Sequence, residues 1–273
     1  MGDEVNNNRI DKMFIELAQK REKALITYIM AGDPNLQVTE SLVKALASGG
    51  SDLIELGVPF SDPLADGPSI QRASQRSLAD GTTLSSILEL VAKLRTDTQI
   101  PIVLMSYYNP ILKFGIEQFV EKAAASEIDG VIVPDLPLEE SGRLADLLGS
   151  RGKYLIPLLA PTSTGQKIGQ VAQRKTGFVY CVSLTGVTGA REELPLGVYD
   201  FLQRVRKNNH QPIAVGFGIS KPEQARKISE FCDGVIVGSA IVNLVEKYQQ
   251  QISVLEEEIK QFVGTLKASL KSD

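Results

Sequence analysis

The chain has 273 residues and a formal net charge of −4, because 29 Lys and Arg face 33 Asp and Glu. This balance argues against general nucleic-acid binding, which depends on neutralising phosphates with basic side chains. One histidine (His210) and two cysteines exclude a histidine-rich metal site and a disulfide framework. Any acid–base chemistry must therefore come from carboxylates, Tyr, Lys or backbone groups.

The hydropathy pattern predicts a soluble chain. Residues 1–6 are polar, and no apolar run approaches the ~20 residues of a membrane span. We therefore expect a cytoplasmic protein, or one of the plastid stroma. Cys181 and Cys232 lie in or beside apolar runs and are expected to be buried free thiols, whereas His210 lies in a polar turn and is expected at the surface.

Eight short apolar runs, rich in β-branched residues, predict strands that are covered on both faces. The runs are residues 24–30, 53–56, 102–105, 130–133, 155–159, 178–182, 213–215 and 234–237. A helical pattern follows each strand, and a further amphipathic helix around Ile10, Met13, Phe14 and Leu17 precedes the first. The intervening helices are expected near residues 38–46, 84–91, 116–125, 139–148, 164–174, 198–206 and 221–231, with a short one opening at 239.

Eight strand–helix units in about 250 residues fit a (β/α)8 TIM barrel with an extra N-terminal helix and extra short helices in the loops. An open doubly wound sheet is the alternative. No Pro- or Ser-rich linker divides the chain, so we expect one domain over residues 1–273. The apolar repeat within 252–266 covers only two heptads, and it therefore predicts a helix packed on the barrel wall rather than a coiled coil.

Glu55 stands inside an apolar strand, where a charged carboxylate is costly to bury. It is either a core residue paired with a neighbour or an acid–base group whose pKa is raised. The loop 58–68 that follows contains three prolines and two aspartates, Asp62 and Asp66. Barrels place their active sites on such loops, so these aspartates are candidates for function as well as for turn formation.

Two later loops indicate a phosphate site. Residues 216–220 follow the seventh strand, and Gly238 and Ser239 follow the eighth, which are the loops that often hold phosphate in barrels. Residues 184–195 suit a lid, with an ordinary surface loop as the alternative. Lys153 and Lys221 are poorly placed for a Schiff base, which leaves carboxylate chemistry on a phosphorylated substrate.

The segment 55–68, ELGVPFSDPLADGP, resembles the signature of the tryptophan synthase alpha subunit family. The resemblance continues through residues 31–34, 107–109, 134–137, 186–189, 216–220 and 238–240. It implies a (β/α)8 lyase that splits indole-3-glycerol phosphate into indole and glyceraldehyde 3-phosphate without a cofactor or a metal. It also implies an α2β2 complex with a pyridoxal-phosphate beta subunit.

By this resemblance Glu55 is the general acid–base and Asp66 stabilises positive charge on the indole nitrogen. The implied substrate-binding residues are Tyr28, Ile70, Tyr107, Tyr180, Thr188, Gly189, Phe217, Gly218, Gly238 and Ser239. Pro59, Phe60 and Asp62 are implied to face the beta subunit. The chain departs from many members at Tyr28, where Phe is common, and at residues 184–185, where an arginine-containing pair is usual.

Two other functions stay open at this point. One is another phosphate-binding barrel enzyme of the same pathway, such as an isomerase or an indole-glycerol-phosphate synthase. The other is a non-catalytic barrel that only activates a partner. Val58, Pro59, Phe60 and Leu64 are predicted to place apolar groups in an exposed loop, which favours a protein partner.

Overall fold

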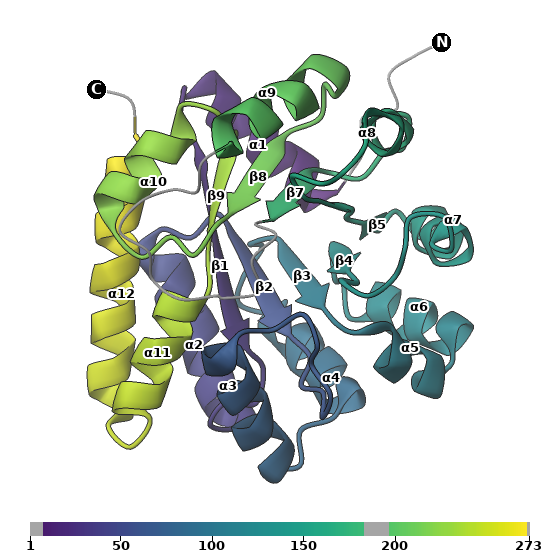
Figure 1. Ribbon diagram of the computed structural model, residues 1–273. Helices are drawn as coiled ribbons and strands as arrows, with labels where there is room; N and C mark the ends of the chain where they lie inside the picture. Colours follow the sequence, from purple (N-terminus) through teal and green to yellow (C-terminus); the bar gives the residue numbers. More distant parts are fainter. Residues whose placement is uncertain (1–7, 183–196, 272–273) are drawn as a thin grey trace.

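The computed structural model describes residues 8–182 and 197–271 (Figure 1). Within these residues a single parallel sheet has the order β5-β4-β3-β2-β1-β9-β8-β7-β6. Its strands are β1 (Ala24–Met30), β2 (Leu53–Gly57), β3 (Ile102–Met105), β4 (Gly130–Ile132), β5 (Tyr154–Leu155), β6 (Leu158–Leu159), β7 (Val179–Val182), β8 (Ile213–Gly216) and β9 (Gly234–Val237). All eight predicted strands are confirmed, the fifth of them in two pieces.

Strands β5 and β6 are separated only by Ile156 and Pro157, and together they occupy the fifth predicted strand. Pro157 has no N–H to donate, so it interrupts the ladder at this point. Strand β5 pairs with β4, and β6 pairs with β7. Because both ends of the sheet lie on this one segment, the sheet closes on itself. The barrel prediction is therefore confirmed, and an open doubly wound sheet is excluded.

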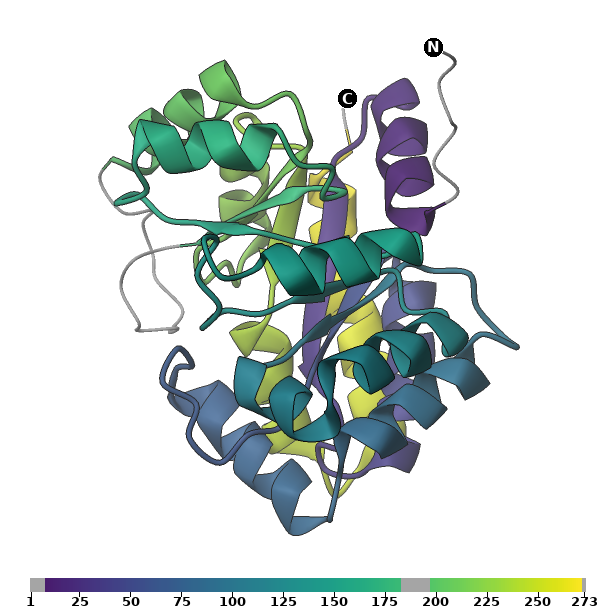
Figure 2. The same cartoon turned by 90° about the vertical axis from the view of Figure 1, so that its right-hand side faces the viewer.

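Helices surround the sheet (Figures 1 and 2). They are α1 (Arg9–Gln19), α2 (Leu36–Gly49), α3 (Pro68–Ala79), α4 (Leu84–Leu94), α5 (Tyr108–Phe114), α6 (Ile116–Ala125), α7 (Gly142–Ser150), α8 (Gly165–Ala172), α9 (Val198–Asn208), α10 (Pro222–Ser229), α11 (Ser239–Tyr248) and α12 (Ile252–Ser269). Helix α12 runs along α2 and buries Leu255, Ile259 and Leu266, which confirms a helix on the barrel wall. Among the described helices, α3, α5 and α11 are additional to the one helix that follows each strand, and α5, with seven residues, is a short one.

The inside of the barrel is apolar at the end where the strands begin. Leu53 of β2 and Phe178, just before β7, belong to one buried cluster with residues of α1. The ring of Phe14 in α1 lies 5.9 Å from the ring of Phe178. Helix α1 therefore closes this end, and polar side chains further along the strands must serve the opposite end.

No helix in the described ranges is long and apolar enough to cross a membrane. The two cysteines are buried free thiols and His210 is exposed, as the sequence predicts.

Candidate active site

Glu55 lies in the middle of β2, beside Tyr28 of β1 and Val103 of β3 in the strand register. Its side chain is fully buried, at 0% exposure. Among the described residues neither carboxyl oxygen of Glu55 has a hydrogen-bond partner. Burial therefore raises the pKa of Glu55 to about 8, because a charged carboxylate here would lose its hydration without gaining a hydrogen bond or an ion pair. Among the described residues no neighbour pairs with Glu55 as a core glutamate would require, and at neutral pH the carboxyl is mostly protonated.

Asp66 lies in the loop between β2 and α3, and its surroundings differ from those of Glu55. Burial raises the pKa of Asp66 to about 6, against a hydrogen bond with the Tyr107 side chain that favours the charged form. The Tyr107 hydroxyl also accepts a hydrogen bond from the backbone N–H of Ala65 at 2.8 Å. Tyr107 thus fixes the loop at two successive residues. At neutral pH Asp66 is mostly ionised, so the site holds one protonated and one charged carboxyl.

Two buried tyrosines complete this part of the site. Burial, reinforced by the charges of Asp66 and Glu55, raises the pKa of both Tyr28 and Tyr180, so their hydroxyls stay protonated. The ring of each tyrosine packs closely against a glycine at the end of a strand. A Cβ built at Gly57 would lie 2.1 Å from Tyr28 Oη, and one at Gly216 would lie 2.8 Å from Tyr180 Oη. Any side chain at these glycines would displace a tyrosine from the site.

Gly57 is a functional residue that sequence reasoning did not single out. Its only sequence signal is a glycine at the end of an apolar strand, directly after Glu55, where a close approach by another group is common.

The predicted phosphate loops lie at the same end of the barrel. Gly238 comes directly before α11, which begins at Ser239, so the free N–H groups of a helix start are placed here. A Cβ at Gly238 would lie 3.4 Å from Tyr28 Cβ, which puts this helix start next to the carboxyl site. Gly218 has a φ of +73°, a conformation that favours glycine. Phe217 is buried in the neighbouring loop.

Ile70 is also brought to this site. It lies on α3 and belongs to one buried apolar cluster with Tyr28 and Met30 of β1. Thr188 and Gly189, together with the whole segment 184–195, lie outside the described residues, so their roles stay predictions.

An ion-pair network under α3 was not anticipated from the sequence. Arg76 of α3 donates from Nε and Nη2 to the two carboxyl oxygens of buried Asp33, at 2.7 and 2.8 Å. Its Nη1 reaches Glu246 of α11 at 3.2 Å. Arg76 therefore ties together the turn after β1, the helix that follows Asp66 and the helix that begins at Ser239. The partners are 43 and 170 residues from Arg76 in sequence, so no local pattern could reveal them.

The loop 58–68, which was predicted to expose apolar residues, is only partly exposed. Val58 and Pro59 are buried, which corrects the prediction of an exposed apolar run. Phe60 is half-buried, with its ring 5.2 Å from that of Tyr107. Val58 is buried because its N–H continues the sheet by donating to Met105 at 2.8 Å. Asp62 is exposed, and Leu64 is 97% exposed.

Comparisons with known proteins agree on one family. A family model described as tryptophan synthase alpha chain matches residues 14–271. A tryptophan synthase alpha chain from Carboxydothermus hydrogenoformans is 47% identical over 265 residues, covering 97% of this chain and 99% of that protein.

Solved structures give the same result. Tryptophan synthase subunit alpha from Legionella pneumophila superposes with a TM-score of 0.89 at 35% identity, covering 96% of this chain and 98% of that chain. A chain of the tryptophan synthase complex from Pyrococcus furiosus superposes with a TM-score of 0.83 at 36% identity, covering 90% and 99%.

The unpartnered carboxyl predicts a pH-dependent stability difference between the wild type and Glu55→Gln. Because the folded pKa of Glu55 is raised from 4.5 to about 8, the folded wild type retains a proton that the unfolded chain loses. The wild type should therefore lose free energy of unfolding relative to the variant, by a few kcal/mol, as pH rises from about 4.5 to about 8. Urea denaturation across this pH range measures the difference.

Asp62→Asn, at an exposed carboxyl of the same loop, is the control and should follow the wild-type curve. Parallel curves for wild type and Glu55→Gln would show that Glu55 ionises normally in the fold.

Proposed function

Because the chain belongs to the tryptophan synthase alpha chain family, we propose that it cleaves indole-3-glycerol phosphate into indole and glyceraldehyde 3-phosphate. The observation that carries the proposal is the pair of carboxyls at one end of the barrel. Glu55 has a pKa of about 8 and Asp66 a pKa of about 6, so near neutral pH one can donate a proton while the other carries a charge. Pairs of carboxyls tuned apart in this way mark the acid and the anion of a site.

The proposed reaction transfers two protons through Glu55 and breaks one carbon–carbon bond. The Glu55 carboxyl protonates indole C3, which leaves a positive charge delocalised toward the ring nitrogen. The carboxylate so formed takes the proton of the substrate hydroxyl on the glycerol carbon that is bonded to C3. The electrons of that O–H bond form the aldehyde, and those of the carbon–carbon bond return to the ring. Glu55 is protonated again at the end, so protons and electrons balance without a cofactor.

Asp66 supports this reaction electrostatically. Its carboxylate would accept a hydrogen bond from the indole N–H, and this interaction strengthens as positive charge develops on the ring. The hydrogen bond from Tyr107 holds the charged form in place. The buried rings of Tyr28 and Tyr180 lie near Glu55, and we infer that the flat ring system binds in a slot beside them.

The phosphate would bind at the far side of this slot. Gly218, Gly238 and the start of α11 at Ser239 offer backbone groups that approach an anion closely. We include Thr188 and Gly189 in the proposed substrate site on the resemblance alone. Tyr28, where many relatives have Phe, adds a neutral hydroxyl to the slot and leaves the two carboxyls as they are.

The two other functions are not favoured. Another phosphate-binding barrel enzyme would not need the whole 55–68 segment, and the comparisons over nearly the whole chain all indicate tryptophan synthase alpha chains. A barrel kept only to activate a partner would have no reason to retain a buried, unpartnered Glu55, because such a group costs stability.

The purified chain should release indole from indole-3-glycerol phosphate, and Glu55→Gln should reduce this turnover by about 10²–10⁴-fold. Asp66→Asn should reduce it by about 10²-fold, because the amide cannot balance the ring charge. Indole and glyceraldehyde 3-phosphate are measured together, and circular dichroism checks the fold. Asp62→Asn should retain near wild-type turnover. The lyase function is wrong if no indole forms above background even with a beta subunit present.

The two carboxyls, Glu55 and Asp66, also predict how kcat/KM depends on pH. Activity should rise with a pKa of about 6 as Asp66 ionises and fall with a pKa of about 8 as Glu55 loses its proton. In Asp66→Asn the acid limb should disappear while the alkaline limb remains. Initial rates at low substrate concentration test this. An alkaline limb that persists in Glu55→Gln would assign it to another group.

We further propose that the chain works in an α2β2 complex with a tryptophan synthase beta subunit, in the cytoplasm or the plastid stroma. One of the structural relatives is described as a tryptophan synthase complex. Phe60, Asp62 and Leu64 lie on the loop that carries Asp66, so a partner bound here would adjoin the catalytic loop. We retain Pro59 as a support of this loop rather than a contact, since its side chain is buried.

Leu64→Asp should weaken binding of a tryptophan synthase beta subunit by about tenfold or more, because a fully exposed leucine gains most from burial in an interface. Size-exclusion chromatography and titration calorimetry measure the complex. Ile15→Asp, at an exposed leucine-sized residue of α1 at the closed end, is the matched control and should bind like the wild type. Equal effects of both substitutions would argue against this loop as the interface.

A further inference from the structure

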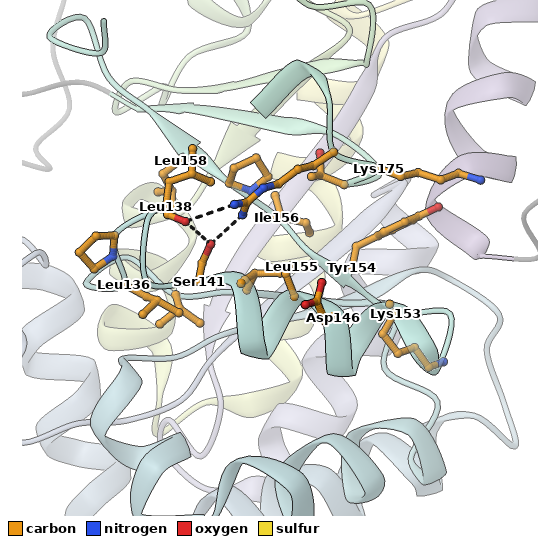
Figure 3. Close-up of a pocket in the computed structure, with 18 of the residues that line it drawn as sticks. Leu136, Leu138, Ser141, Asp146, Lys153, Tyr154, Leu155, Ile156, Leu158 and Lys175 are labelled. Atoms are coloured by element: carbon orange, nitrogen blue, oxygen red, sulfur yellow. Dashed lines mark hydrogen bonds between the residues drawn. The ribbon is translucent and has the colours of Figure 1, made fainter. Parts of the chain in front are cut away.

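A groove of about 880 Å³ lies on the outside of the barrel between α7 and the residues that follow α8 (Figure 3). Its size is within the range of sites for small molecules. The bottom of the groove is the interrupted strand 154–158. Neither carboxyl of the candidate active site lines it, although residues 134–137 of the family resemblance do.

The bottom of this groove is apolar and incompletely covered. Leu136 and Leu155 line it and are only partly buried, whereas Leu158 at its edge packs against the inner cluster of the barrel. Helices normally cover the outer face of a barrel strand completely. Here α7 and α8 are short, with nine and eight residues, and they leave the region beside Pro157 open. An occupant with an apolar body would complete the burial of these leucines.

The charges that face inward are positive. Lys167 and Arg174 line the groove with partly buried side chains, whereas the carboxylates of Asp135 and Asp146 are exposed. Lys153 also borders the groove, but its ammonium points away from it, toward the charges of Asp129 and Arg9. The positive charge of this groove contrasts with the net charge of −4 of the whole chain. A concave site lined by one sign of charge attracts the opposite sign.

Arg174 is the best-placed of these cations. It reaches across the groove, where Nη1 donates to Ser141 Oγ at 2.8 Å and Nη2 reaches the Leu138 carbonyl oxygen at 3.4 Å. Figure 3 shows these bonds beside the labelled Leu138 and Ser141. Both partners are neutral, and in the described ranges no carboxylate pairs with Arg174. A guanidinium has five N–H donors, so it retains donors for an anion.

We propose that this groove binds a small amphipathic carboxylate, with its apolar body on Leu136 and Leu155 and its carboxylate at Arg174 and Lys167. An inorganic anion would leave the leucines uncovered, and a neutral apolar molecule would desolvate Arg174 without pairing its charge. A carboxylate matches the planar fork of a guanidinium.

One hydrogen bond joins the groove to the catalytic end. Asp135, at the rim, accepts from the backbone N–H of Tyr108 at 2.8 Å. Tyr108 follows Tyr107, whose hydroxyl supports the Asp66 loop. The groove therefore adjoins the catalytic end, and its edge at Leu158 packs against the cluster that contains Tyr180.

The probe is phenylpropionate fluorinated on its ring, followed by fluorine NMR in a titration of the full chain. We expect saturable binding that Lys167→Ala and Arg174→Ala each weaken by about tenfold, the loss of one charge-assisted hydrogen bond. The matching alcohol, which lacks the carboxylate, should bind more weakly by a similar factor. Lys122→Ala, at an exposed lysine of α6, is the control and should bind like the wild type.

Three results would overturn the proposal. The first is binding that neither substitution weakens, and the second is equal binding of the alcohol. The third is displacement of the probe by saturating glycerol phosphate, which would place it in the catalytic site. Because Arg174→Ala also removes the contact between α7 and the end of α8, thermal melting checks its fold. Lys167→Ala carries the test independently if that variant is unstable.

Discussion

The site depends on the burial of one carboxyl without a partner. Glu55 is completely enclosed in β2, and neither of its oxygens has a hydrogen bond in the described structure. A charged carboxylate there would lose its hydration without compensation, so the proton stays on and the pKa rises to about 8. The barrel must supply enough apolar packing elsewhere to tolerate this residue. The cluster beneath it, closed by α1, does so.

Much of the fold could be predicted from the sequence because parallel strands buried on both faces are continuous apolar runs. Strands β1, β3 and β9 have the predicted bounds. The break at Pro157 escaped prediction, although it decides where the ring closes. The burial of Val58 and Pro59 also escaped, because a hydrogen bond from Val58 to Met105, 47 positions further along the chain, extends the sheet past its predicted end.

The two carboxyls were predicted from local context, but their supports were not. Glu55 stands out because it interrupts an apolar run, and Asp66 stands out within a proline-rich loop. Gly57 and Arg76 do not, since their roles depend on partners distant in sequence. Gly57 gives room to Tyr28, and Arg76 joins Asp33 to Glu246. Residues that position others are therefore the part that a single sequence reveals least.

The two carboxyls differ first in depth of burial and then in hydrogen bonding. Both are desolvated, yet only Asp66 has a hydroxyl partner that favours its charged form. If Glu55 gained a similar donor, its pKa would fall toward that of Asp66, and the site would hold two anions at neutral pH. Neither would then be mainly in the protonated form that can donate to a carbon atom. Burial without a partner among the described residues thus makes Glu55 an acid, while the hydrogen bond from Tyr107 lowers the pKa of Asp66 and favours its anion.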